Sequence, residues 1–435
     1  MTFISTRAPD GPRFSLAEAL RLGPAPDGGL FMPAAVEPLG DDFFTELPQR
    51  SLVEIAVAVL EHLLPGELDD AALRTLAADA LDFDIPRVEV APGLSVLELF
   101  HGPTLAFKDV GARFLARLLA LTQPAGRRAT VLVATSGDTG GAVAQAFFVI
   151  DGVEVAILYP DGKVSPLQER QFTTLGGNVK AYAVDGVFDD CQRLVKEAFA
   201  DRGLAADLGL TSANSINVGR LLPQSIYYFH AAARALAAGH DPAQPLLFST
   251  PSGNFGNLTA GLLARRLGLD ARFIAATNAN DVVPQYLDTG RFEPRPSLRT
   301  LSNAMDVGHP NNFERILHLY GDDWAAIARD VSGFRVDDGA TRGTIRRVVD
   351  HHGYLLDPHT AVGWLAAEKI RSDSPNAGPA IVLGTAHPAK FSDLVEPIIG
   401  RKIELPERLA RHLEKPVLSV KIRPELEELT GELLS

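Results

Sequence analysis

The chain has 435 residues, of which 46% are hydrophobic and 22% charged, so it can bury the cores of two or three domains, and wholesale disorder is excluded. Acidic residues outnumber basic ones 54 to 41, and the resulting net charge of -13 argues against nucleic acid as a partner. The single cysteine excludes an intrachain disulfide. The chain shows neither a signal-like start nor a run of roughly 18 apolar residues, so we expect a cytoplasmic protein with no membrane partner.

The first 95 residues differ in pattern from the rest. Turns rich in Pro and Gly at residues 24–29 and 38–40 come first. Apolar residues at three- and four-residue spacing then predict helices over residues 51–64 and 70–81. We expect residues 1–95 to form an N-terminal domain.

From about Val88 onward, short aliphatic or β-branched runs alternate with helical stretches. The predicted strands are residues 129–134, 153–159, 180–184, 245–250, 273–277 and 380–383. The predicted helices between them are residues 142–150, 166–175, 188–200 and 258–267. This alternation predicts an α/β fold with largely parallel sheets covered on both faces. Residues 291–306, rich in Arg, Pro and Ser, are expected to form an ordered surface excursion.

Two glycine-rich corners follow predicted strands, SGDTGG at residues 136–141 and SGNFGN at 252–257. A corner of this kind brings unpaired N–H groups and the positive end of a helix close to an anion. Neither corner matches the dinucleotide or P-loop pattern, and an ordinary strand–helix turn has the same composition. Together they indicate one or two anionic groups held by backbone and neutral donors.

The segment HGPTLAFKDVG at residues 101–111 places Lys108 among apolar neighbours. Desolvation favours the neutral, nucleophilic form of a lysine amine. Alternatively, the side chain reaches solvent or pairs with Asp109. The segment by itself leaves both interpretations open.

Seven segments taken together resemble the threonine synthase family, in its longer bacterial and fungal branch. They are HGPTLAFKDV (101–110), ATSGDTGG (134–141), YPDGKVSPLQERQ (159–171), NSINVGRLLPQ (214–224), PSGNFGN (251–257), DPHTAVG (357–363) and GTAHPAKF (384–391). Residues 5–31 are similar to the amino-terminal domain of that branch. The order of the motifs is kept to about Phe391, and the last 40 or so residues carry no motif that adds to the resemblance.

The resemblance implies a fold-type II pyridoxal-phosphate enzyme, like the β subunit of tryptophan synthase. Its N-terminal domain would be residues 1–95, its small α/β domain 96–215 and its large α/β domain 216–435, with the cofactor in the cleft between the two α/β domains. The implied reaction converts O-phospho-L-homoserine and water to L-threonine and phosphate, the last step of threonine biosynthesis. The enzyme would be a carbon–oxygen lyase acting on phosphates.

The resemblance also assigns roles to individual residues. Lys108 would bind pyridoxal phosphate as a Schiff base, and the hydroxyl of Thr385 would face the ring nitrogen. A hydroxyl there does not force that nitrogen to be protonated, which favours elimination and replacement over transamination. Backbone N–H groups would cup the cofactor phosphate in the loop Ser252, Gly253, Asn254, Phe255, Gly256 and Asn257. Asn257 stands where many relatives have Asp, and we expect it to cap the following helix.

The other glycine-rich corner would meet the substrate. By resemblance, Ser136, Gly137, Asp138 and Thr139 face the substrate carboxylate and the hydroxyl side of the cofactor. Gly141 stands where many relatives have Ser. Lys163 and Arg170 flank a predicted strand–helix corner and are candidates for the substrate phosphate, with solvated helix charges as the equal alternative.

The remaining polar residues give weaker indications. The histidines show no metal-ligand spacing, so no metal site is expected, and His387 is the only one expected near the cofactor ring. Cys191 lies in a predicted amphipathic helix and is interpreted as core packing.

Two rival functions stay open at this point. A phospholyase or a serine or threonine dehydratase of the same fold would share the cofactor residues. A non-catalytic pyridoxal-phosphate-binding protein would lack the lysine or the phosphate loop, and Lys108, Gly253 and Gly256 are all present. The sequence does not distinguish a monomer from a dimer.

Overall fold

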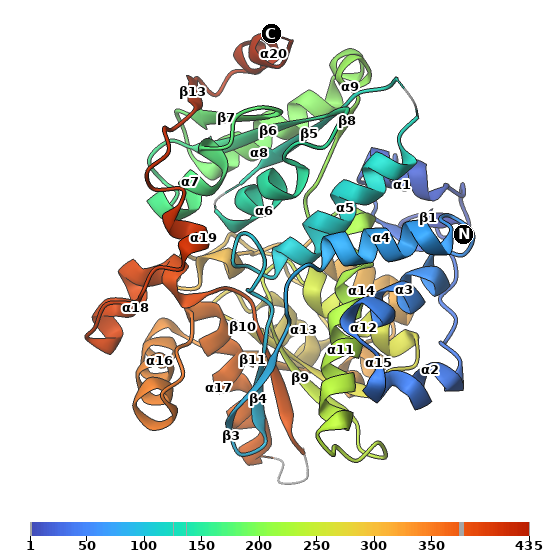
Figure 1. The fold of residues 1–435 in the computed structure, drawn as a ribbon, viewed down its shortest axis with the longest axis vertical. Helices are drawn as coiled ribbons and strands as arrows, with labels where there is room; N and C mark the ends of the chain where they lie inside the picture. Colours follow the sequence, from blue (N-terminus) through green and yellow to red (C-terminus); the bar gives the residue numbers. More distant parts are fainter. Residues whose placement is uncertain (1, 125, 136, 374–377, 435) are drawn as a thin grey trace. The chain divides into compact units, whose positions relative to one another are not determined.

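The computed structural model describes residues 2–124, 126–135, 137–373 and 378–434. They divide into two units that interleave along the chain (Figure 1). Unit 1 contains Met32–Phe107 and Leu221–Glu404, and unit 2 contains Thr2–Phe31, Lys108–Arg220 and the residues from Leu405 onward. The domain ranges expected from the sequence are consecutive instead, and they stay a prediction.

The N-terminal region is mainly helical. Its elements are β1 (Phe3–Ser5), α1 (Leu16–Leu22), β2 (Phe31–Pro33), α2 (Asp41–Glu46), η1 (Leu47–Gln49), α3 (Leu52–Leu63) and α4 (Asp70–Ala80). The last two confirm the predicted helices. In α3, Ser51 and Glu54 form a reciprocal capping box, which satisfies N–H groups that the helix itself leaves unpaired.

Unit 1 is built on a six-stranded sheet in the order β11-β10-β9-β12-β4-β3. The strands are β3 (Arg87–Ala91), β4 (Leu94–Glu98), β9 (Leu246–Pro251), β10 (Ala271–Thr277), β11 (Val331–Arg335) and β12 (Ala380–Gly384). All neighbours are parallel except β3 and β4. The short helix α10 (Val218–Leu221) lies where, along the chain, unit 2 ends and unit 1 resumes. The later helices of unit 1 are α11 (Gln224–Ala237), α12 (Gly256–Arg266), α13 (Val282–Thr289), η2 (Asn303–Met305), α14 (Phe313–Tyr320), α15 (Trp324–Asp330), α16 (Asp338–His352), α17 (Pro358–Asp373), η3 (Pro388–Phe391) and α18 (Ser392–Ile399).

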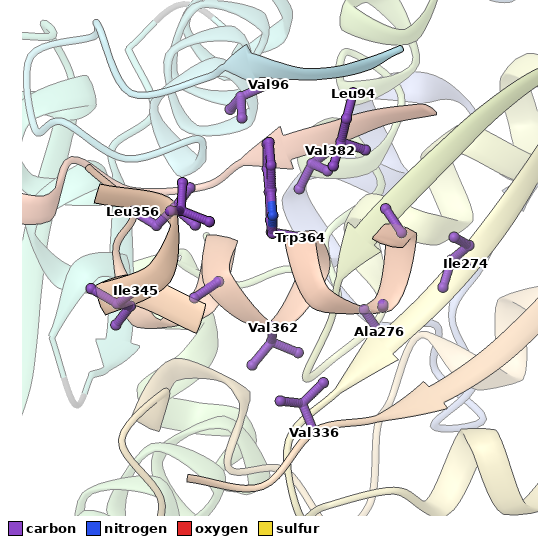
Figure 2. Packing of buried hydrophobic residues seen from close by; sticks show 14 of the residues in the cluster. Leu94, Val96, Ile274, Ala276, Val336, Ile345, Leu356, Val362, Trp364 and Val382 are labelled. Carbon is purple, nitrogen blue, oxygen red and sulfur yellow. The ribbon is translucent and has the colours of Figure 1, made fainter. Parts of the chain in front are cut away.

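Helices cover both faces of this sheet. Consecutive strand residues point to opposite faces. Ile274 of β10 belongs to the core cluster that contains Trp364 of α17 (Figure 2). Its neighbour Phe273 packs against Tyr228 of α11, with ring centroids 5.8 Å apart. The expected burial of a parallel sheet on both faces is confirmed for unit 1.

Unit 2 contains a five-stranded, fully parallel sheet in the order β13-β7-β6-β5-β8. Its strands are β5 (Ala129–Ala134), β6 (Val153–Pro160), β7 (Val179–Val184), β8 (Leu210–Thr211) and β13 (Ser419–Ile422). Its helices after residue 107 are α5 (Lys108–Thr122), α6 (Asp138–Phe147), α7 (Pro166–Thr173), α8 (Phe188–Ala200), α9 (Arg202–Leu208), α19 (Glu407–Ala410) and α20 (Leu426–Leu434). The last residues of the chain thus supply an edge strand and a helix, α20, whose Leu429 shares a core with α8. Cys191 is fully buried in that core, and burial raises the pKa of its thiol to about 12, which confirms a packing role.

Two predicted helices begin earlier than their composition suggested. Helix α6 starts at Asp138 rather than residue 142, and α12 starts at Gly256 rather than 258. The extra residues include glycines, which are typical of loops. In α6, a Cβ on Gly140 would lie 2.5 Å from the Thr135 side chain, so glycine is there for close approach rather than for a turn. Among the described residues, no helix is both long enough and apolar enough to span a bilayer.

Candidate active site

The loop between β9 and α12 has the features of an anion-binding turn. Phe255 precedes the helix in the left-handed region, with φ of 60°, an uncommon conformation for a bulky residue. A Cβ on Gly253 would lie 2.6 Å from Met305 Cα and 3.0 Å from Ala304 O, so only glycine fits there. The loop is therefore held in one strained shape that ends at the start of a helix, where N–H groups are available.

Asn257 braces this loop from inside. Its Oδ1 accepts hydrogen bonds from Ser252 Oγ and Leu258 N, each at 2.9 Å, and its Nδ2 donates to Pro251 O at 2.8 Å. The expectation that Asn257 caps α12 is wrong, because Phe255 is the N-cap residue and Asn257 lies within the first turn. The amide instead ties the end of β9 to the start of the helix.

Asn254 is fixed from another segment. Its Oδ1 accepts a hydrogen bond from Asn311 N at 2.6 Å.

The segment at 291–306, expected to be a surface excursion, also contacts the loop after β9. Its end, η2, supplies the Ala304–Met305 peptide that packs on Gly253.

Lys108 is the first residue of α5 and is partly buried. The preceding residue, Phe107, donates its backbone N–H to Thr385 O at 2.9 Å. Leu105, three residues before the lysine, has a φ of 57° and accepts a hydrogen bond from His387 N at 3.0 Å. The strained segment before the lysine is therefore tied to the segment that carries Thr385.

Thr385 lies just after β12 and is 6% exposed. Its backbone N–H donates to Thr360 Oγ1 at 3.3 Å. A side chain at the carboxyl end of a central parallel strand is where open α/β sheets place their ligands. This position is compatible with the predicted role beside a cofactor ring.

The other glycine-rich corner lies in unit 2, between β5 and α6. Ser136 lies outside the described residues. Thr135 Oγ1 accepts hydrogen bonds from Gly137 N at 3.0 Å and Gly140 N at 2.8 Å, and Asp138 accepts one from Gln168 Nε2 at 2.7 Å. Thr139 is partly exposed. Of the four residues predicted to meet the substrate carboxylate, the three described ones thus belong to one corner that hydrogen bonds hold in a fixed shape.

The two candidates for the substrate phosphate each have a structural partner in unit 2. Lys163 is exposed and donates to Gly186 O at 2.9 Å. Arg170 Nη1 donates to three carbonyl oxygens of the C-terminal segment: those of Leu413 at 2.9 Å, Lys415 at 3.0 Å and His412 at 3.5 Å. These contacts favour the structural interpretation of Arg170, and a phosphate-binding role for either residue stays a prediction.

We expect Arg170→Ala to loosen the C-terminal segment rather than to weaken substrate binding. The substitution removes the guanidinium group that donates hydrogen bonds to the carbonyl oxygens of His412, Leu413 and Lys415. Amide hydrogen exchange should therefore speed up about tenfold or more at Leu418, whose N–H donates to Thr173 O, because each lost charge-assisted bond contributes about 1.5–3 kcal/mol. The exposed Arg202→Ala is the control. A raised KM for substrate with unchanged exchange would instead assign Arg170 to the phosphate.

A cluster of titratable side chains surrounds His387 in unit 1. Glu98 Oε2 lies 2.7 Å from His101 Nε2, and Tyr354 Oη donates to Glu98 Oε1 at 2.7 Å. Burial acts to raise the pKa of Glu98, but these two hydrogen bonds outweigh it and keep that pKa below its ordinary value. Burial lowers the pKa of His387, with further lowering by His101 and Lys390. His387 lies two residues beyond Thr385, and its place beside a cofactor ring stays a prediction.

Three buried residues of the DPHTAVG segment were missed as candidates. Asp357, His359 and Thr360 form a hydrogen-bonded group that contacts both Thr385 and the Ala304 backbone. The segment served for the resemblance, but nothing in its local pattern indicates those contacts. No group of three or more metal-binding side chains occurs among the residues that the structure describes.

The residues of unit 1 fit pyridoxal phosphate. Its phosphate needs N–H donors at a helix start, which the turn from Gly253 to Gly256 provides, and a Cβ on Gly253 would push this turn away from Ala304 and Met305. Its ring nitrogen needs a polar partner, and Thr385 offers a hydroxyl at the end of β12.

Comparisons with known proteins agree with this assignment. Residues 86–384 match the family model "Pyridoxal-phosphate dependent enzyme", residues 2–81 match "Threonine synthase N terminus", and residues 360–430 match "Threonine synthase, C-terminal". A threonine synthase of Haemophilus influenzae is 44% identical over 421 residues, which cover 97% of this chain and 96% of the relative. A threonine synthase of Saccharomyces cerevisiae is 34% identical over 475 aligned positions, covering 94% of this chain and 92% of the relative.

Solved structures extend the likeness to the whole fold. The crystal structure of threonine synthase from Escherichia coli has a TM-score of 0.90 at 42% identity and covers 100% of this chain and 99% of that one. The threonine synthase of Brucella melitensis, solved with pyridoxal phosphate bound, has a TM-score of 0.92 at 37% identity, with 100% and 98% covered. The predicted fold-type II class is thereby confirmed. With its loops, its lysine and these relatives, the chain belongs to the threonine synthase family of pyridoxal-phosphate-dependent enzymes.

Proposed function

We propose that the protein converts O-phospho-L-homoserine and water to L-threonine and phosphate, with Lys108 as its catalytic amine. The observation that carries this proposal is the hydrogen bond from Phe107 N to Thr385 O. This bond fixes Phe107, the residue before the lysine, next to Thr385. The hydroxyl of Thr385 is the group proposed to face the cofactor ring. The family membership supports the same reaction.

Bound pyridoxal phosphate supplies a conjugated ring that withdraws electrons from the substrate nitrogen and so stabilises negative charge at Cα. Lys108 Nζ, once the substrate amine has replaced it on the cofactor, is free to act as a base. It takes the proton from Cα and then one from Cβ, which allows phosphate to leave from Cγ. The same amine returns one proton to Cγ. Water adds its hydroxyl at Cβ, Cα receives the second proton from Lys108, and the proton left from water goes to the released phosphate. Lys108 then displaces threonine.

The other residues act by binding and orientation. Gly253 to Asn257 hold the cofactor phosphate with backbone N–H groups at the start of α12. Gly137, Asp138 and Thr139, together with Ser136, are proposed to meet the substrate carboxylate. The firmly braced turn at Thr135 supports this role, because a fixed corner loses little entropy when substrate binds.

Incubation of the purified protein with O-phospho-L-homoserine should release threonine and phosphate in equal amounts. Both products must be measured, because a phospholyase or dehydratase on the same fold also uses the lysine and the phosphate loop. Phosphate without threonine would replace the proposal with the phospholyase reaction. Retained cofactor without turnover of this substrate would indicate a different substrate.

A further inference from the structure

The segment Asp357–Thr360 is held firmly in place at the start of α17. Leu356, on one side of it, and Val362 and Trp364, on the other, are each at most 1% exposed and lie in the main core of unit 1 (Figure 2). Because packing anchors the backbone on both sides, the polar side chains between these anchors have little freedom. These side chains can therefore hold the groups that they contact in fixed positions.

Asp357 accepts four hydrogen bonds within this segment, and its side chain is fully buried. Its Oδ1 accepts from His359 N at 2.9 Å and from His359 Nδ1 at 2.8 Å. Its Oδ2 accepts from Thr360 N at 3.3 Å and from Thr360 Oγ1. An ionised carboxylate, which only accepts, matches this arrangement of donors.

The direction of each outer hydrogen bond is determined by chemistry. The backbone N–H of Thr385 can only donate, so Thr360 Oγ1 accepts from it and directs its own proton to Asp357. The backbone N–H of Ala304 likewise donates to His359 Nε2 at 3.1 Å. The ring proton of His359 then lies on Nδ1, facing Asp357, a tautomer that this network assigns.

The hydrogen bonds that run from Asp357 through His359 to Ala304 form a phosphate branch, which ends beside the proposed phosphate loop. Ala304 O and Met305 Cα lie where a Cβ on Gly253 would come within 3.0 Å and 2.6 Å of them. The position of this peptide therefore determines where Gly253 can sit. His359 Nε2 accepts the Ala304 N–H, which lies in the adjoining Asn303–Ala304 peptide, and so helps to fix Ala304 in place.

We propose that Asp357 is a positioning residue that sets both ends of the cofactor site, the ring end through Thr360 and Thr385 and the phosphate end through His359 and Ala304. The inference rests on the proposed function of Thr385 and Gly253. Helix capping alone accounts for the two backbone N–H groups that Asp357 accepts. It does not account for the side-chain bonds that run on to Thr385 and Ala304.

The hydrogen bonds from Asp357 through Thr360 to Thr385 form the ring branch. This branch is tested with Thr360→Val, which keeps the shape and removes the hydroxyl, against Thr360→Ser, which keeps the hydroxyl. The full-length protein is loaded with pyridoxal phosphate labelled with nitrogen-15 in the ring, and the ring-nitrogen chemical shift is measured by NMR. Thr360→Val should move this shift and lower kcat about tenfold, with the dissociation constant of the cofactor within about threefold of wild type. Thr360→Ser should restore both values. If the valine variant does not fold, Thr360→Ala replaces it.

The phosphate branch is tested with a second pair at His359. An asparagine amide can imitate the Nδ1–H donor but loses the acceptor for Ala304 N, whereas a glutamine oxygen can reach the Nε2 position. His359→Asn should weaken pyridoxal phosphate about tenfold, and pyridoxal, which lacks the phosphate, by less than about threefold. His359→Gln keeps an acceptor for Ala304 N but loses the donor to Asp357, so it should weaken pyridoxal phosphate less than His359→Asn does but measurably relative to wild type; wild-type binding would remove Asp357 from the phosphate end. Equilibrium dialysis of the full-length protein measures both ligands.

Two results would overturn the inference. One is an unchanged ring-nitrogen shift in Thr360→Val, and the other is an equal weakening of pyridoxal and pyridoxal phosphate in His359→Asn. Either would leave Asp357 a helix cap that affects only stability. Thr385→Val separates this failure from that of the proposed function. If it also leaves the shift unchanged, then Thr385 is not the ring partner, and the ring half of both proposals is wrong.

Discussion

Lys108→Ala should abolish threonine formation and leave no cofactor attached to the chain after borohydride reduction. The wild-type protein should be yellow, and reduction should fix the cofactor on the peptide that contains Lys108. Removal of the amine takes away both the covalent attachment and the proposed proton carrier. A proton carrier alone contributes about 10²–10⁴-fold to rate, so the loss of turnover should be at least that large. Absorption spectra and peptide mass spectrometry provide the measurements.

Lys196→Ala is the matched control, because Lys196 is exposed on α8 and has no proposed role. This variant should keep its colour, its reduced adduct and its activity. Recovery of the reduced cofactor on Lys163 or Lys390 would contradict the assignment. Lys390 is a meaningful competitor, since it is buried in unit 1 and its Nζ donates to Thr104 O at 2.6 Å.

Gly253→Ala should weaken cofactor binding. The new Cβ would come within 2.6 Å of Met305 Cα, and the backbone cannot step aside as the end of a flexible side chain could. Overpacking of this kind costs about 1–3 kcal/mol, which corresponds to a cofactor dissociation constant raised by about 5- to 150-fold if the loop bears the strain. Equilibrium binding of pyridoxal phosphate measures the effect.

Gly343→Ala adds the same methyl group without a collision. Gly343 lies within α16, and nothing stands within 4 Å of the added atom. This variant should be more stable by about 0.5–1 kcal/mol, because alanine favours the helix, and its cofactor affinity should be unchanged. An unchanged affinity in Gly253→Ala would mean that the loop after β9 is only a strand–helix turn.

The sequence predicted the parts of the fold that local pattern determines. Strand β5 and helix α8 begin and end where the periodicity placed them, since a buried strand and an amphipathic helix each carry their own spacing. The antiparallel pairing of β3 with β4 was not foreseen, nor was the joining of β13 to β7. Those pairings depend on segments that meet only in the folded chain.

The candidate site shows the same division. The lysine and the glycine loops lie in short, distinctive motifs, so resemblance could identify them. The partners of Asp357 could not be found in this way, because Ala304 and Thr385 lie 53 residues before it and 28 residues after it. His359 was not expected near the cofactor ring, since one histidine beside a proline carries no sign of what its ring contacts.

The edge strand β13 has a consequence for how the protein matures on the ribosome. Strand β7 pairs with β6 as soon as both have emerged, but its other edge stays open until residues 419–422 are made. More than 230 residues, including most of unit 1, are synthesised in between. At roughly 5–20 residues per second, this exposes an unpaired strand edge for roughly 10–50 seconds. Nascent chains that stall before Ser419 should therefore depend on chaperones, and release of the full chain should end that dependence.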